Sequence, residues 1–328
     1  FPFFLIARKV APALITGNTI VIKPSEETSN NAFLFSKIIN DLDLPKGIIN
    51  FVYGRGETVG KHLSAHPDID MISFTGSVET GSSIMKEAAK NITKVNLELG
   101  GKAPAIVLAD ADIEKAATNI KNARVINSGQ VCNCVERVYV QENILDEFTD
   151  KLTNVMKSVN FGNPNNEENI EYGPMINKEG LNKVESLVST AKNDGAEIIT
   201  GGNSKKIEEG SYYEPTVLAN CKQNMEIVRK EIFGPVLPII SFKDLDQAIE
   251  FANDCEYGLT SSIFTSNIKT AMRAANEIKF GETMINRENM EIFQAFHAGV
   301  RKSGIGGADG KHGLYEYTQT HGVYINYE

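Results

Sequence analysis

No hydrophobic run in this 328-residue sequence is long enough to cross a bilayer. The longest, such as Phe3 to Ala7 and Val236 to Ile240, fall far short of the ~20 residues that a membrane-spanning helix needs. No secretory signal precedes the cysteines, and the four cysteines are too few for a disulfide framework. These absences predict a protein of the reducing cytoplasm with no membrane partner.

Positive charge is also scarce. The 33 Lys and Arg residues are outnumbered by 42 Asp and Glu, which gives a net charge of −9, and they form no basic block. A protein that binds duplex nucleic acid needs a cationic face to displace counterions from phosphates, so nucleic acid is not an expected partner. With 41% hydrophobic and 23% charged residues, the composition is that of a globular chain of about two domains.

Helical and strand-like segments alternate along the first hundred residues. Helical patterns cover 3–14, 31–39, 57–63 and 78–91, and strand patterns cover 19–22, 48–52 and 71–74. Such alternation predicts parallel strands joined by right-handed crossovers, and hence a doubly wound α/β sheet. Ligands bind such sheets at the carboxyl ends of the strands. The residues that follow those ends are Lys23, Gly54, Gly56, Gly76 and Ser77.

The alternation continues with longer elements beyond residue 105 and predicts a second α/β domain. The expected organisation is a first domain over 1–100, a second over 101–302 and a C-terminal segment over 303–328. Val323 to Tyr327 is β-prone, and a terminal strand of this kind can add to the sheet edge of another subunit. We therefore expect a homo-oligomer, either a dimer or a tetramer.

Two glycine patterns and one cysteine pair carry candidate chemistry. The spacings that begin at Gly54 and Gly76 both miss the dinucleotide fingerprint, so each taken alone is more simply a turn. Cys132 lies in a polar, loop-like stretch two residues before Cys134. The other two cysteines are isolated and His62 and His66 have no acidic third ligand, so no metal site is predicted. A reactive thiol and an inert buried cysteine both remain open for Cys132.

The sequence resembles the NAD(P)-dependent aldehyde dehydrogenase superfamily over its whole length. The resemblance is carried by Val95–Lys102 and Gly129–Cys132, and it recurs in Ile22–Glu26, Phe74–Ser77, Glu231–Val236 and Ser303–Gly307. It implies a doubly wound parallel-sheet NAD-binding domain, incomplete at its N-terminus, and a second α/β catalytic domain.

The resemblance also implies catalytic and cofactor roles. Cys132 would be the nucleophile that passes through a thiohemiacetal and a thioester, and Glu98 the general base that activates water. Without the resemblance, Glu98 would be a solvated charge on an exposed strand end. Lys23 and Glu26 would bind the adenosine ribose, where an acidic group repels a 2′-phosphate and favours NAD over NADP. Gly76 and Ser77 would meet the pyrophosphate, and Glu231 and Phe233 the nicotinamide ribose and ring.

The segment from Asn286 to Gly299 is similar to the lactaldehyde and glycolaldehyde dehydrogenase branch of that family. In that branch, Glu and His at the positions of Glu291 and His297 meet the hydroxyl of the substrate. The implied substrate is a small hydroxyaldehyde, because an aldehyde without the hydroxyl would leave those polar groups unpaired. The alternative interpretation is an ordinary loop histidine and a solvated glutamate.

Family members have a longer N-terminal part, which includes a Pro-Trp-Asn before the Phe-Pro that begins this chain. The resemblance therefore implies a truncated chain. Loss of the Asn donor to the oxyanion would cost on the order of 10²- to 10³-fold in rate. Two alternatives stay open: an inactive remnant that retains NAD or subunit binding, and an acylating or esterase activity of Cys132. Glu98 argues against acyl transfer to coenzyme A, because family members that make acyl-CoA tend to lack that base.

Overall fold

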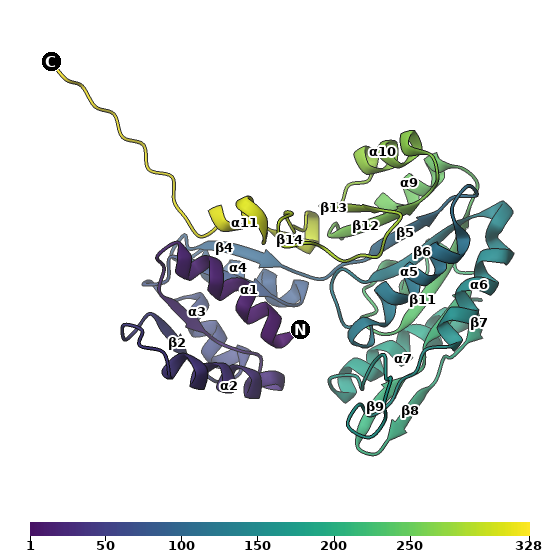
Figure 1. Cartoon of the computed structure of the whole chain (residues 1–328), viewed down its shortest axis with the longest axis horizontal. Coiled ribbons are helices and arrows are strands. Elements are labelled where there is room, and N and C mark those ends of the chain that lie inside the picture. Colours follow the sequence, from purple (N-terminus) through teal and green to yellow (C-terminus); the bar gives the residue numbers. More distant parts are fainter. The chain divides into compact units, whose positions relative to one another are not determined.

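Late segments of the chain return to the N-terminal region and complete the first of two units. The computed structural model describes residues 1–328. Unit 1 consists of Phe1–Glu98, Glu291–Ala298 and Gly304–Glu328, and unit 2 of Leu99–Met290 and Gly299–Ser303. The return of 291–298 and 304–328 appears in Figure 1 as yellow ribbon beside purple and blue elements of unit 1.

Unit 1 contains two small sheets with helices around them. Its helices are α1 (Pro2–Ile15), α2 (Ser29–Asn40), α3 (Lys61–Ser64), α4 (Val78–Ala88) and α11 (Gly310–Tyr315), with a 3₁₀ turn at Glu26–Thr28 and a π turn at Gly56–Gly60. Its strands are β1 (Ile20–Ile22), β2 (Ile49–Phe51), β3 (Met71–Thr75), β4 (Lys94–Glu98) and β14 (Gly304–Ile305). β1 and β2 pair in parallel, while the second sheet has the order β14-β4-β3.

The pairing of β14 with β4 fixes the backbone of Glu98. β3 runs parallel to β4, whereas β14 runs antiparallel and places Gly304 opposite Glu98. Gly304 has φ +151°, and a Cβ there would lie 2.0 Å from the carbonyl oxygen of Leu97. Only glycine allows this approach, so the Ser303–Gly304 pair of the sequence is what lets the late segment pair with β4.

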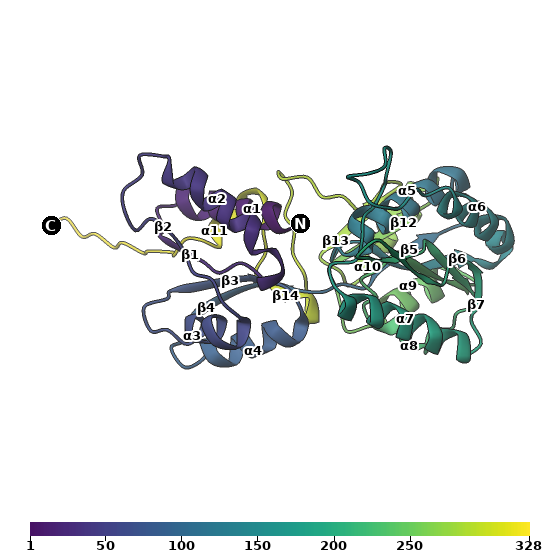
Figure 2. The same ribbon diagram turned by 90° about the horizontal axis from the view of Figure 1, so that it is seen from below.

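Unit 2 is a seven-stranded sheet with helices on both faces, seen from two directions in Figures 1 and 2. The main sheet has the order β13-β12-β5-β6-β11-β10-β7, and only β7 is antiparallel to its neighbour. Its strands are β5 (Ala103–Val107), β6 (Val135–Gln141), β7 (Glu197–Thr200), β10 (Thr216–Ala219), β11 (Val236–Phe242), β12 (Thr260–Phe264) and β13 (Glu282–Ile285). A separate hairpin pairs β8 (Ser204–Ile207) with β9 (Gly210–Tyr213).

The helices of unit 2 are α5 (Ile113–Val125), α6 (Leu145–Lys157), α7 (Lys178–Asn193), α8 (Glu226–Arg229), α9 (Leu245–Asn253) and α10 (Ile268–Glu277), with short 3₁₀ turns at Ile126–Gly129, Glu142–Ile144 and Arg301–Ser303. The alternating side chains of β5 separate two apolar cores. Ala105 and Val107 pack in one core with α5 and α6, whereas Ile106 packs in the other with α7, α9 and α10. Burial on both faces explains why the central strands are almost continuously apolar.

The α/β fold class expected from the alternation is confirmed by this architecture. The expected single sheet over the first hundred residues is in fact split into two sheets. Val323 to Tyr327 forms no strand here and runs as an extended tail (Figure 1), since a strand needs a neighbour to pair with. The domain boundaries at 100 and 302 stay a prediction. No helix combines the length and the apolar character needed to span a membrane.

The fully buried position of Ile106 predicts a stability effect. Replacing Ile106 with Ala should lower the free energy of unfolding by about 2–5 kcal/mol, because it leaves a cavity between β5 and its covering helices. The exposed Ile268, 66% accessible at the start of α10, is the control, and its replacement by Ala should cost less than about 0.5 kcal/mol. Urea unfolding of both variants measures this, and equal losses would contradict the core position of Ile106.

Candidate active site

The loop that carries Cys132 has an unusual backbone. After α5 ends, Asn127, Ser128 and Gly129 all have positive φ, of 50°, 60° and 75°. Positive φ is costly for the L-residues Asn127 and Ser128 and persists only where surrounding contacts hold them, whereas Gly129 adopts it without strain. Cys132 is half-buried, whereas Cys134 is buried and its pKa is raised to about 12 by that burial. Cys132 is therefore the partly accessible thiol of this loop.

Buried hydrogen bonds hold the loop in place. Arg124 donates through Nη2 to the carbonyl oxygen of Gly129, at 2.5 Å, and through Nη1 to that of Val135, at 2.7 Å. Ser128 Oγ donates to the carbonyl oxygen of Gly173 at 2.8 Å. A Cβ on Gly129 would lie 2.4 Å from the backbone of Gly234. The loop thus packs directly on the segment that follows Glu231 and Phe233.

Two glycines bring Glu231 close to the same loop. The Glu231 carboxylate accepts a hydrogen bond from the N–H of Gly101 at 2.8 Å, and a Cβ on Gly100 would lie 2.8 Å from Glu231 Oε1. A Cβ on Gly101 would lie 2.3 Å from the carbonyl oxygen of Cys132. Burial and the neighbouring carboxylate of Glu136 raise the pKa of Glu231. Gly100 and Gly101 are therefore required by contacts with two predicted site residues.

A fully buried carboxylate connects these segments through hydrogen bonds. Glu136 of β6 accepts hydrogen bonds from Lys102 Nζ at 2.7 Å and Arg124 Nη1 at 2.8 Å. It also accepts from the backbone N–H groups of Ile232, at 2.8 Å, and Phe233, at 3.1 Å. Burial by itself raises the pKa of a carboxyl, but the two cations reverse this and lower the pKa of Glu136 to about 2. The carboxylate is therefore ionised at neutral pH.

In unit 1, Glu98 lies at the end of β4 and is only 5% exposed. The alternative interpretation of a solvated charge on an exposed strand end does not hold, because β3 and β14 flank β4. His297 Nε2 lies 3.7 Å from Glu98 Oε2. His297 is 1% exposed, and its backbone exchanges two hydrogen bonds with Ala308. The structure thus brings together the predicted base and one predicted substrate residue.

The other predicted substrate residue, Glu291, pairs with a cation that the sequence analysis missed. Arg8 of α1 donates through Nη1 to Glu291 Oε1 at 3.3 Å, and through Nε to Asp309 Oδ1 at 3.0 Å. Its Nη2 also contacts Asp309 Oδ2. Phe4, one helical turn earlier, packs against Phe293 with the two rings tilted and their centroids 5.9 Å apart. The i, i+4 spacing of an aromatic and an arginine on α1 is the one signal that could have marked Arg8.

Lys9, the next residue of α1, is a second cation near Glu98. Its Nζ donates to Ser73 Oγ at 2.8 Å. Burial lowers the pKa of Lys9 from 10.5 to about 8, assisted by the positive charge of Arg8 and opposed by Glu98. A lysine with this pKa holds its proton less firmly than an exposed one.

The predicted dinucleotide residues of unit 1 form two small groups. Lys23 Nζ lies 3.5 Å from Glu26 Oε2 and donates to the carbonyl oxygen of Pro24 at 2.9 Å. Glu26 is exposed, and hydrogen bonding to its own backbone N–H together with Lys23 lowers its pKa. Ser77 caps α4, with Oγ accepting from the N–H of Thr80 at 3.2 Å. An exposed carboxylate can accept from ribose hydroxyls, while an ammonium and a helix N-terminus can donate to a phosphate, so this set could hold a dinucleotide.

The structure therefore sorts the predicted residues by unit. Unit 1 contains Lys23, Glu26, Gly76, Ser77, Glu98, Glu291 and His297, and unit 2 contains Cys132, Glu231 and Phe233. Phe233 has φ +58° and is fixed by its N–H bond to Glu136. No group of three or more His, Cys, Asp or Glu side chains is arranged to hold a metal ion.

Comparison with known proteins decides the family. The sequence model of the aldehyde dehydrogenase family matches residues 1–323. The chain belongs to the aldehyde dehydrogenase family. Lactaldehyde dehydrogenase of Escherichia coli (strain K12) is 59% identical over 326 residues, which are 99% of this chain and 68% of that protein. A crystal structure of E. coli lactaldehyde dehydrogenase matches with a TM-score of 0.97, 59% identity and the same coverage.

Other members of the family are also similar to this aldehyde dehydrogenase. 3,6-Anhydro-alpha-L-galactose dehydrogenase of Vibrio sp. (strain EJY3) is 42% identical and covers 100% of this chain and 69% of its own length. A structure of betaine aldehyde dehydrogenase from Staphylococcus aureus in complex with NAD+ has a TM-score of 0.93 and 41% identity, with 96% of this chain and 63% of that one covered. These matches confirm the predicted family and its class of enzyme, a nicotinamide-dependent oxidoreductase that converts aldehydes to acids.

The lowered pKa of Lys9 predicts a pH-dependent stability difference. Between pH 8 and 10.5 the unfolded chain holds a proton on Lys9 that the folded chain has released, so unfolding becomes less favourable as pH rises. Relative to Lys9→Met, the wild type should therefore gain up to about 3 kcal/mol over this range. Urea unfolding at several pH values measures the difference. The exposed Lys90→Met variant is the control. If the difference in unfolding free energy between wild type and Lys9→Met does not change with pH, the burial of the ammonium is refuted.

Proposed function

We propose that the protein oxidises a small 2-hydroxyaldehyde, lactaldehyde or glycolaldehyde, to the carboxylic acid with NAD+, using Cys132 as nucleophile. The observation that carries this proposal is the half-buried Cys132 thiol on a loop of three positive-φ residues, held by Arg124 and packed on Gly234. A thiol fixed in this way meets its substrate without first ordering a mobile loop.

The proposed chemistry uses one residue for each bond-making step. The Cys132 thiolate adds to the aldehyde carbon and gives a thiohemiacetal. Bound NAD+ would supply a hydride acceptor. Loss of the hydride from the carbon bound to sulfur would leave the substrate as a thioester on Cys132. Glu98 then takes a proton from water, whose oxygen attacks the thioester carbon. The Cys132 sulfur departs as the thiolate and the acid is released, while Glu98 passes its proton to solvent, so both groups are ready for another cycle.

The predicted cofactor-binding residues suit NAD+ better than its 2′-phosphorylated form. Lys23 and Glu26 would hold the adenosine ribose, Gly76 and Ser77 the pyrophosphate, and Glu231 and Phe233 the nicotinamide ribose and ring. The exposed Glu26 carboxylate, whose pKa is lowered, is a hydroxyl acceptor and repels a phosphate. The proposal includes a cytoplasmic homo-oligomer assembled through the tail, where Tyr324 and Tyr327 are 99% and 88% exposed.

Glu291 and His297 would recognise the substrate hydroxyl. Both belong to one returning segment, and both lie in a charged setting, with Arg8 beside Glu291 and Glu98 beside His297. A buried polar site of this kind discriminates strongly against an aldehyde that lacks the matching hydroxyl. The similarity to E. coli lactaldehyde dehydrogenase supports the same substrate class.

Cys132→Ala and Glu98→Gln test the two catalytic roles separately. Cys132→Ala should lower glycolaldehyde oxidation by more than about 10⁴-fold, because no covalent intermediate can form. Glu98→Gln should lower steady-state turnover by about 10²- to 10⁴-fold but retain a first burst of NADH, since only thioester hydrolysis needs the base. Stopped-flow absorbance of NADH measures both, with Cys255→Ala as control. Unimpaired oxidation by both variants sinks the proposal, and NAD+ binding by wild type without any turnover indicates a non-catalytic chain.

Glu291→Leu tests recognition of the hydroxyl. The variant should lose about 10- to 100-fold in kcat/KM for lactaldehyde and glycolaldehyde, because their hydroxyl loses its partner, while propanal oxidation stays close to wild type. The exposed Gln294→Leu of the same segment is the matched control. Steady-state kinetics with the three aldehydes decide the matter. Equal losses for propanal would show that Glu291 does not read the hydroxyl.

A further inference from the structure

We propose that Glu136 is a positioning residue of the active site, because one carboxylate fixes both the Cys132 loop and the Ile232–Phe233 turn. This inference rests on the proposed function for Cys132, Glu231 and Phe233. Glu136 itself lies on β6, fully buried and outside the sequence motifs that carry the family resemblance. It touches none of the predicted reacting atoms and acts through the backbone that presents them.

The first half of the argument is the connection to the nucleophile loop. Arg124 uses Nη1 on Glu136 Oε1 and Nη2 on the carbonyl oxygen of Gly129, so the carboxylate orients the guanidinium that holds the loop. Arg124 is fully buried, and its planar fork meets three acceptors: Glu136 and the carbonyl oxygens of Val135 and Gly129. Without Glu136, this buried cation would lose its only carboxylate hydrogen bond and be held by backbone carbonyls alone.

The second half is the connection to the turn that follows Glu231. The same carboxylate accepts the backbone N–H groups of Ile232 and Phe233. Phe233 has φ +58°, an uncommon conformation for an aromatic residue, which needs such contacts to persist. Glu231 immediately precedes these two residues, so its carboxylate over Gly100 and Gly101 depends on the same anchor.

Only a carboxylate of this length satisfies all four donors. Each Glu136 oxygen receives one side-chain cation and one backbone N–H group: Oε2 receives Lys102 and Ile232, and Oε1 receives Arg124 and Phe233. Glutamine would turn an NH₂ group toward two donors and leave them unpaired. Aspartate is one methylene too short to reach both segments. The conservative replacements should therefore fail to rescue the function.

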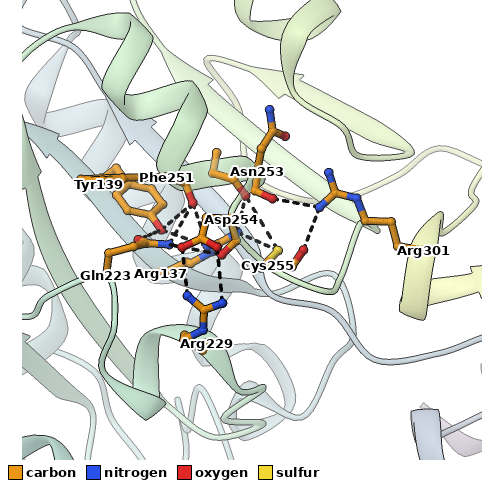
Figure 3. A network of polar contacts seen from close by, with 10 residues as sticks. Arg137, Tyr139, Gln223, Arg229, Phe251, Asn253, Asp254, Cys255 and Arg301 are labelled. Carbon is orange, nitrogen blue, oxygen red and sulfur yellow. Dashed lines mark hydrogen bonds and ion pairs between the residues drawn. The ribbon is translucent and has the colours of Figure 1, made fainter.

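The test compares Glu136→Gln with Tyr139→Phe, a matched loss of hydrogen bonds on the same strand. The Tyr139 hydroxyl bonds to Arg137 and Gln223, in the network shown in Figure 3, and to none of the four donors of Glu136. Three quantities are measured: amide hydrogen exchange at Ile232 and Phe233, the Kd for NAD+ by calorimetry, and kcat per NAD+ binding site. The calorimetric stoichiometry counts only folded sites that bind NAD+, so dividing by it removes the effect of a reduced folded fraction.

Glu136→Gln should speed exchange at both amides, raise the Kd for NAD+ by about tenfold and lower kcat per NAD+ site by about 10²-fold, a loss typical of a small misplacement of reacting groups. Tyr139→Phe should leave all three values within about twofold. A purely structural role predicts fewer NAD+ sites with unchanged Kd and unchanged kcat per site, and that result would overturn the proposal.

Arg124→Lys keeps the proposal testable where Glu136→Gln does not fold. A lysine cannot bridge Glu136 and Gly129 at once, so exchange should rise at the loop amides of Gln130 and Cys134 and kcat per site should fall at least tenfold, with the Kd for NAD+ within about twofold. Unchanged kcat per site in this variant contradicts the inference. Absence of aldehyde turnover by wild type refutes the proposed function alone, because the exchange and Kd measurements still report on Glu136.

Discussion

Backbone contacts that leave no room for a Cβ are the constraint on which the nucleophile region depends. Gly101 lies against the carbonyl of Cys132, Gly100 against the carboxylate of Glu231, and Gly129 against the backbone of Gly234. Each approach is closer than any side chain allows. These glycines are therefore required because the segments that carry them pack closely against their neighbours, in addition to any role in contacting a ligand.

Such close packing of backbone leaves polar groups that must find partners away from water. In unit 2 the buried ions Glu136, Lys102 and Arg124 form a cluster that provides such partners. Burial lowers the pKa of Lys102 to about 8 against the attraction of Glu136, so the cluster costs solvation free energy. A buried ion pair is weak evidence for stability but can specify one arrangement of the chain. Here that arrangement includes the loop of Cys132 and the turn at Ile232 and Phe233.

The sequence was informative where the pattern is local. The helix over 3–14 and the strand over 71–74 lie within one residue of α1 and β3, because apolar periodicity and a following Gly or Thr-Gly reflect short-range physics. Ser77 as the start of a helix follows from the same reasoning. The cofactor and nucleophile positions came from the family resemblance and stay predictions.

The features that the sequence pattern could not predict depend on residues far away in the sequence. Glu98 is buried because β14, two hundred residues later, pairs with β4, and nothing in Val95–Glu98 indicates that partner. Arg8 acquires its role from Glu291 and Asp309, which return to unit 1 only after unit 2 is built. Glu136 carries no motif of its own in the sequence, and its four donors come from three separate segments.

The places where the chain passes from one unit to the other coincide with residues predicted to be functional. Glu98 is the last residue of unit 1 before the chain enters unit 2, and Glu291 is the first after it returns. Gly304 pairs with Glu98, and the N–H of the following residue, Leu99, donates to the carbonyl oxygen of Ser303 at 2.9 Å. The backbone of Glu98 is thus restrained on both sides of the crossing. The predicted base thus lies on a backbone that hydrogen bonds hold on either side, and its buried carboxylate keeps a fixed place beside His297.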